Sequence, residues 1–143
     1  MQLFPVTQKD LYFINFDKLI LPKTPNYALV QYPLEKVQPR QLKSPVCKIS
    51  IMDLKHKTEE ILLQYPRIKK VQEDVAKNQQ IYVRRTRIMK FPDIINIQFI
   101  KIDDTHSTFS MLSRAKYGYS DLNVNPTFVA SFIRDLTQAL LNQ

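Results

Sequence analysis

Apolar and polar residues alternate most clearly over residues 94–102, where Ile95, Ile97 and Phe99 lie on one side of the pattern. A period of two is typical of a β-strand with one buried face. Other stretches that favour β-structure predict further strands at residues 69–73, 80–89 and 107–115. Turns are expected between them at residues 74–78, 91–93 and 103–106. The pattern therefore predicts four consecutive antiparallel strands.

A helical period replaces this alternation near the C-terminus. Apolar residues recur there at three- and four-residue spacing, at Phe128, Val129, Phe132, Ile133, Leu136, Leu140 and Leu141. We expect Asn125 to be the N-cap of this helix and Pro126 its first residue. A second helix is predicted over residues 52–64, before Pro66, and a short strand over residues 46–51 precedes it.

The predicted order is strand, helix, four strands, helix. This order favours an α+β domain of two layers, in which two helices cover the apolar face of an antiparallel meander. It is similar to the order in helix-grip lipid-binding domains, as an analogy of topology. Five of the nine prolines lie within residues 1–44, so we expect there an extended arm that wraps an α+β core of residues 45–143. The arm and core together form a single predicted domain of residues 1–143.

The chain is basic, with 21 Lys and Arg against 13 Asp and Glu and a formal net charge of +8. This balance favours an anionic partner such as nucleic acid, acidic lipid or a phosphorylated ligand. One cysteine, Cys47, excludes an intramolecular disulfide, and with only two histidines we expect no metal site and no cofactor. No apolar run is long enough to span a membrane and no signal peptide is evident, so we expect a cytoplasmic protein.

Residues 112–125 form a polar corner between the last strand and the last helix. They contain Gly118, the only glycine of 143 residues, which indicates a backbone position where a Cβ is not tolerated. The run Ser113-Arg114-Ala115-Lys116-Tyr117-Gly118-Tyr119-Ser120-Asp121-Leu122-Asn123-Val124-Asn125 resembles the domain-of-unknown-function family numbered 1499. Further landmarks are Arg85-Thr86-Arg87, Phe91-Pro92-Asp93, Pro25-Asn26-Tyr27 and Ser44-Pro45-Val46, so the resemblance covers roughly residues 24 to 138.

The resemblance implies an α+β fold and a common surface in a largely bacterial family, and it implies no accepted enzymatic activity. Three residues depart from the family pattern: Ala115 replaces a frequent serine, Asn123 a glycine, and Pro126 a frequent basic residue. Asparagine tolerates a positive φ better than most residues, so the turn at Asn123 can persist. Any anion contact from the basic residue is lost at Pro126.

Alternation along the predicted strand 80–89 places Arg85 and Arg87 on the face of Val83, where a guanidinium needs an acidic partner or an anionic ligand. The candidate ligand-binding residues are Arg85, Arg87, Arg114, Tyr117, Tyr119, Ser120, Asp121 and Asn125. The candidate structural residues of the corner are Phe91, Pro92, Asp93, Gly118 and Asn123. In the structural alternative, the arginines pair with Asp93 and Asp121 and bind nothing else.

Three functions remain open. The first is a non-enzymatic binding module for a small amphipathic or anionic ligand, in a pocket lined by Ile95, Ile97, Phe99, Phe128 and Phe132. The second is a protein-interaction module that uses residues 117–125. The third is nucleic-acid binding through the predicted strand segment from Arg84 to Lys90, with Tyr82 and Phe91 as stacking rings. Catalytic motifs are lacking, so an enzyme is not expected.

Overall fold

Four consecutive antiparallel strands, β3 to β6, form the larger part of the sheet, as the alternation predicts. The structure, a computed structural model, describes residues 3–33, 41–117 and 124–142. Within these ranges six strands form one open sheet in the order β2-β1-β6-β5-β4-β3, with β1 and β2 parallel to each other. The strands are β1 (Tyr27–Gln31), β2 (Gln41–Lys43), β3 (Ile68–Asp74), β4 (Gln79–Arg85), β5 (Pro92–Asp103) and β6 (His106–Ala115).

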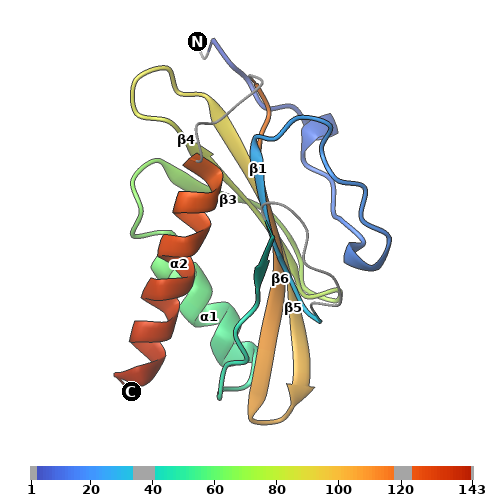
Figure 1. Cartoon of the computed structure of the whole chain (residues 1–143), viewed down its shortest axis with the longest axis vertical. Helices are drawn as coiled ribbons and strands as arrows, with labels where there is room; N and C mark the ends of the chain where they lie inside the picture. The colour runs from blue at the N-terminus through green and yellow to red at the C-terminus, as the bar shows by residue number, and fades with distance from the viewer. Residues whose placement is uncertain (1–2, 34–40, 118–123, 143) are drawn as a thin grey trace.

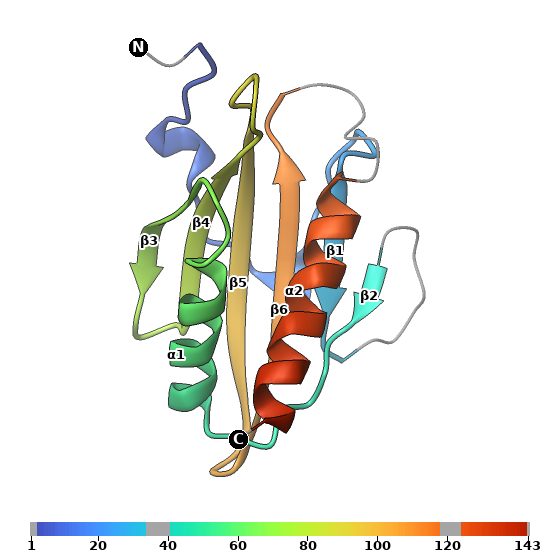
Figure 2. The ribbon, with the colours of Figure 1, turned by 90° about the vertical axis from the view of Figure 1, so that its left-hand side faces the viewer.

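Both helices lie on one face of this sheet, and Figure 2 shows them in front of the strands. The first helix is α1 (Ile51–Leu62), and the side chain of Ser50 caps its N-terminus by accepting a 3.1 Å hydrogen bond from the backbone N–H of Asp53. The second helix, α2 (Val124–Leu141), carries the predicted apolar stripe. The predicted α+β class with two helices on the sheet is confirmed.

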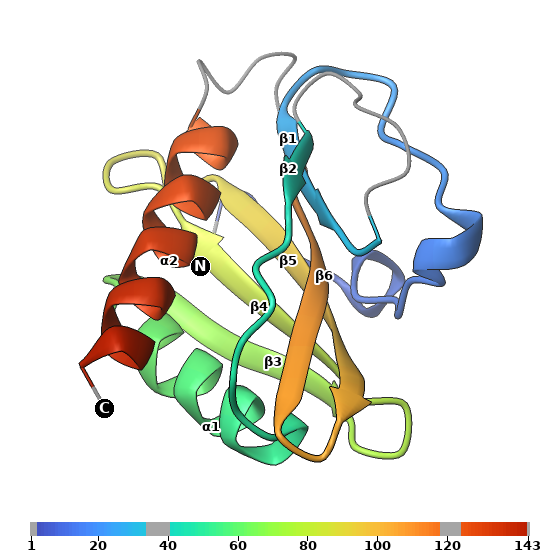
Figure 3. The ribbon, with the colours of Figure 1, turned by 60° about the horizontal axis from the view of Figure 1, so that its bottom comes forward.

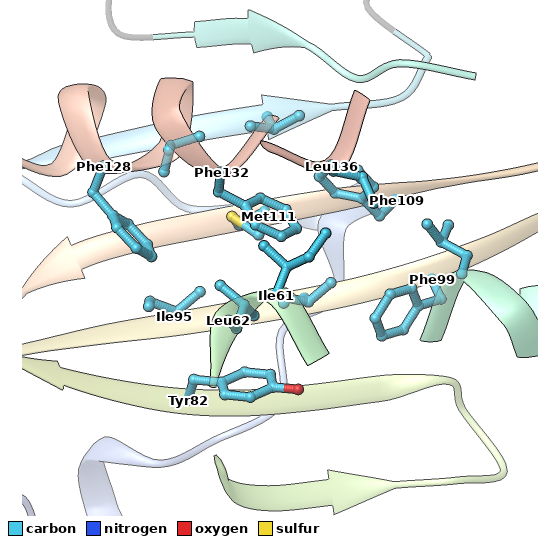
Figure 4. Close-up of a cluster of buried hydrophobic side chains, with 14 of the residues drawn as sticks. Ile61, Leu62, Tyr82, Ile95, Phe99, Phe109, Met111, Phe128, Phe132 and Leu136 are labelled. Carbon is cyan, nitrogen blue, oxygen red and sulfur yellow. The ribbon is translucent and has the colours of Figure 1, made fainter. Parts of the chain in front are cut away.

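A single apolar cluster fills the space between the sheet and the helices (Figure 4). Phe132 of α2 is fully buried, and its ring meets the ring of Phe109 edge to face with the centroids 5.9 Å apart. The same cluster contains Ile95, Ile97, Phe99, Met111 and Phe128. This face, which we call the helix face, is therefore the main core of the domain.

The N-terminal residues cross the opposite face of the sheet, which we call the outer face. Figure 1 shows them on the other side of the strands from both helices. A smaller apolar cluster lies there, made of Ile14, Phe16, Tyr27, Leu29 and Leu112. The described part of the arm has two short 3-10 turns, at Gln8–Asp10 and Phe16–Lys18, and is otherwise irregular as far as β1.

The arm expected over residues 1–44 contains two strands that the sequence pattern did not predict, β1 and β2. The apolar residues of β1 pair with β6, so they extend the sheet beyond the meander, and Figure 3 shows β2 beside β1 at the sheet edge. The predicted strand at residues 46–51 is also wrong, because only Cys47 forms an isolated bridge, to Ser107. Ser50 turns the chain into α1 instead.

Two further predictions change at element ends. Strand β4 ends at Arg85, four residues before the predicted end, because Thr86 and Phe91 close a loop: Thr86 N–H donates to Phe91 O at 3.0 Å, and Phe91 N–H to Thr86 Oγ1 at 2.9 Å. The predicted N-cap at Asn125 is wrong, because α2 already includes Val124. The side chain of Asn125 is turned into the interior.

Candidate functional site

The sheet holds the start of the arm through side chains that donate hydrogen bonds to its backbone carbonyl oxygens. Arg85 donates to Phe4 O at 2.8 Å. Lys116 and Tyr117 each donate to Pro5 O at 2.9 Å. Farther along the arm, the carbonyls of Asp10, Tyr12, Ile14 and Phe16 accept from Arg114, Asn96, Gln79 and Gln31 in turn. The cationic and amide donors of the outer face are therefore hydrogen-bonded to the arm.

An ion pair joins the arm to the end of β6. The Lys116 ammonium lies 2.7 Å from a carboxylate oxygen of Asp10. Partial burial raises the pKa of Asp10, but hydrogen bonds from Lys116 and Thr7 outweigh it and bring the pKa below its ordinary 3.8. The hydrogen bond to Asp10 in turn raises the pKa of Lys116. Both groups are therefore charged near neutral pH, and their attraction holds the arm closed.

Between the arm and the β3–β4 edge, the outer face is hollowed into a cleft of about 520 Å³, which we call the outer cleft. This volume is in the range of small-molecule sites. The apolar lining residues are Val6, Leu11, Ile68, Val71 and Val83, and the cationic ones are Arg67, Lys69, Arg85 and Lys90. Of the described residues that line it, none is acidic. The outer cleft therefore combines an apolar wall with a positive rim.

Local backbone geometry fixes the cationic rim. Arg67 and Lys90 have φ values of 61° and 59°, in the left-handed region that few non-glycine residues adopt. Arg67 Nε donates to Arg85 O at 3.0 Å, while Arg85 donates its backbone N–H to Arg67 O at 3.0 Å. The Arg85 guanidinium also donates to Lys90 O at 2.9 Å. These bonds join the start of β3, the end of β4 and the following loop.

A second cleft of about 530 Å³ lies farther along the arm, between residues 12–23 and the end of β6. Its arginine, Arg114, is already engaged: the guanidinium donates to Asp10 O at 3.0 Å and lies 5.1 Å from the centroid of the Tyr12 ring. The other cations that line it are Lys18 and Lys23. The second cleft therefore offers a ligand fewer cations than the outer cleft.

A buried polar cluster lies on the helix face. Asn125 is fully buried, accepts a hydrogen bond from Ser113 Oγ, and donates to Asn26 O at 3.3 Å and to Asp93 Oδ1 at 3.4 Å. Arg84 forms a 3.0 Å ion pair with Asp93. Buried polar groups need partners of this kind. The cluster ties α2 to the sheet, which is a structural role.

The structure places the described members of the predicted ligand-binding set at three separate locations. Arg85, Arg114 and Tyr117 hold the arm on the outer face, Arg87 is exposed in the loop after β4, and Asn125 is buried on the helix face. The predicted residues Tyr119, Ser120 and Asp121, together with Gly118 and Asn123, lie outside the described residues. The described members of the set therefore do not form one site.

The described corner residues also serve both faces. The Phe91 ring packs against Phe4 of the arm, with centroids 4.5 Å apart, and Pro92 begins β5. The carboxylate of Asp93 forms an ion pair with Arg84 on the helix face. The expected partners of Asp93 were Arg85 and Arg87, and the ion pair seen in the structure is with the neighbouring Arg84 instead.

The ligand pocket predicted on the helix face is absent among the described residues. Ile95, Ile97, Phe99, Phe128 and Phe132 are each at most 4% exposed and pack into the core cluster. These side chains pack against one another and leave no room for a ligand beside them. The two phenylalanines of α2, Phe128 and Phe132, are buried against the sheet and fill the space of the predicted pocket.

Sequence reasoning missed Arg67, Lys69 and the wall that the arm supplies through Val6 and Leu11. The strand itself was predicted at residues 69–73, and β3 leaves both Lys69 and Val71 exposed. The position of the arm had no local signal, because residues more than 80 positions away hold it. The described residues contain no helix long and apolar enough to cross a membrane, and no cluster of three His, Cys, Asp or Glu able to hold a metal.

Comparison with protein families agrees with the motifs of the corner and of the loop after β4. The model of the family described as "Protein of unknown function (DUF1499)" matches residues 19–136, so the chain belongs to this family. The match begins within the arm, after the residues whose carbonyl oxygens the side chains of the sheet bind. No curated protein matches the chain.

Proposed function

We propose that this member of the DUF1499 family is a binding module for a small amphipathic anion, held in the outer cleft. The composition of the lining carries the proposal: four cations and five apolar side chains surround one cleft, and none of its described lining residues is acidic. A ligand with a short hydrocarbon body and a carboxylate, sulfonate or phosphate head matches both parts of this lining.

Each part of the lining has a distinct effect on such a ligand. The hydrocarbon body gains from leaving water against Val71 and Val83. The head group gains charge-assisted hydrogen bonds from Lys69 and Arg67, both on the exposed rim. Because these groups are solvated, each contact is worth little alone, and affinity depends on body and head together.

Isothermal titration calorimetry with decanoate tests the proposal. We expect Lys69→Gln to weaken binding about fivefold, as expected for one exposed charge-assisted hydrogen bond. Val71→Asp introduces a like charge beside the carboxylate and should weaken it further. Lys23→Gln is the matched control, because Lys23 is an exposed lysine that lines the second cleft. Decanol, which lacks the charge, should bind the native chain more weakly than decanoate.

Unchanged affinity in Lys69→Gln and Val71→Asp would contradict the proposal. A loss confined to Lys23→Gln would move the site to the second cleft, and equal binding of decanol and decanoate would remove the role of the cations. Thermal unfolding of each variant serves as the folding control, and all three substituted side chains are exposed.

A further inference from the structure

The loop between β4 and β5 carries apolar side chains in water. The paired residues Thr86 and Phe91 close it, and four residues, 87–90, form its apex. Ile88 is 84% exposed and Met89 is 49% exposed. In most loops polar residues occupy such positions, because an exposed aliphatic side chain gains nothing from the solvent. Two adjacent ones on a projecting apex form a small apolar surface.

The start of the arm adds a third apolar side chain at this end of the molecule. Phe4 packs against Phe91 with ring centroids 4.5 Å apart, and Arg85 binds Phe4 O. These contacts hold the preceding residue, Leu3, near the loop, and Leu3 is 79% exposed. Figure 2 shows the N-terminal segment and the β4–β5 loop at the same end of the molecule. We call Leu3 with residues 87–90 the apolar tip.

Positive charge surrounds these apolar side chains. Residues 84–91 contain four cations and no acidic residue. Arg87 and Lys90 are exposed, and Lys90 Nζ donates to Arg87 O at 2.8 Å, which holds the Lys90 ammonium against the loop. Arg67, exposed at the start of β3, is bonded to Arg85 next to the loop. The tip is therefore apolar at Ile88 and Met89 and cationic at the residues on either side of them, Arg87 and Lys90.

We propose that the apolar tip docks on an anionic lipid surface. Leu3, Ile88 and Met89 enter the interface between head groups and acyl chains, while Arg87 and Lys90 bind lipid phosphates. This arrangement matches the two known contributions to peripheral membrane binding, buried apolar side chains and attraction of basic residues to anionic lipid. The tip shares Lys90 with the outer cleft, but Leu3, Arg87, Ile88 and Met89 lie outside the cleft lining, so this inference does not rest on the proposed function.

Nucleic acid fits the same surface less well. A single-stranded nucleic acid needs exposed aromatic rings on which bases stack. Tyr82 is fully buried on the helix face, and the Phe91 ring packs against Phe4. The exposed apolar side chains there, Ile88 and Met89, have no aromatic ring on which a base could stack. Apolar side chains of this kind can enter a bilayer interface.

Co-sedimentation with vesicles tests the proposal. The native chain should sediment with vesicles of phosphatidylcholine and phosphatidylglycerol, much less with phosphatidylcholine alone, and less at high ionic strength. We expect the double variant Ile88→Asp, Met89→Asp to weaken binding by about tenfold or more, and Arg87→Gln by several-fold. Val75→Asp is the matched control: Val75 is 67% exposed and lies in the turn at the opposite end of β4.

Equal binding of the double variant and the native chain would overturn the proposal. So would equal loss in Val75→Asp, or binding to a single-stranded polynucleotide that the double variant retains while vesicle binding is absent. Lys69→Gln should leave vesicle binding unchanged, so a failure of the outer cleft as a ligand site is distinguishable from a failure of the tip. All substituted residues are exposed, and thermal unfolding confirms that each variant is folded.

Discussion

The two faces of the sheet are covered by different means. On the helix face, α1 and α2 bury large apolar side chains, and a polar cluster around Asn125 is fully internal. On the outer face, the irregular arm contributes a smaller apolar cluster, and side chains of the sheet bind its carbonyl oxygens. The helix face therefore resembles the interior of a protein, whereas the outer face resembles an interface with an extended peptide.

This difference bears on the stability of the fold and, under the proposed function, on the access of a ligand to the outer cleft. Burial of large side chains stabilises the fold roughly in proportion to the area removed from water. The hydrogen bonds from half-buried and buried side chains to the arm carbonyls replace hydrogen bonds to water, so their net contribution is small. An opening of the arm is then far less costly than an opening of the helices. The outer cleft lies beneath the part that opens most easily.

The largest expected effect comes from a large cavity on the helix face. Phe132→Ala should lower the free energy of unfolding by about 3–5 kcal/mol, because Phe132 is fully buried between α2 and the sheet. Phe16→Ala, in the smaller outer cluster, should cost at least about 1 kcal/mol less, because the arm can relax into the space. Urea denaturation followed by circular dichroism measures both. Equal losses would show that the two faces contribute alike to stability.

Local patterns predicted the helix face well and the outer face poorly. The alternation at Ile95, Ile97 and Phe99 and the stripe through Phe132 report burial, which determines the core. Ile88 favours a strand by propensity, but the pairing of Thr86 with Phe91 places it in a loop. Such a turn outweighs local preference.

The position of the arm depends on contacts between distant residues. Asn96 binds Tyr12 O across 84 positions, and Arg114 binds Asp10 O across 104 positions. A donor side chain and a carbonyl acceptor leave no periodic trace in the sequence, since every residue has a carbonyl. The sequence therefore indicates Arg85 as a candidate site residue, but it does not indicate that the arm is its binding partner.

An intermediate effect is expected when the arm loses its ion pair. Asp10→Asn removes the attraction to Lys116, so backbone amides of residues 3–16 should exchange with deuterium about fivefold faster, as for a loss of roughly 1 kcal/mol. Amides of β5 and α2 should be unchanged, and Asp104→Asn, an exposed ion-pair partner of Lys101, is the control. Faster exchange throughout the chain would contradict separate opening of the arm.

The same ion pair gives the arm a dependence on pH. Because the pKa of Asp10 in the folded chain is below its ordinary 3.8, its stabilising effect is complete above that pH and is lost as the pH falls through the lowered value. Protection of residues 3–16, corrected for intrinsic exchange, should therefore decrease in acid for the native chain. Asp10→Asn should lack this step.

The smallest expected effect is that of Asp10→Asn on the labelling of Cys47, a residue of the helix-face core. Cys47 is 2% exposed within the core cluster, and burial raises the pKa of its thiol to about 11. At pH 8 only about one thiol in a thousand is ionised, so labelling by a disulfide reagent should be at least about 100-fold slower than in the unfolded chain. Asp10→Asn should leave this rate unchanged within about twofold, whereas Phe132→Ala should increase it. An increase in Asp10→Asn would mean that the arm and the helices open together, and the two faces would then form one cooperative unit.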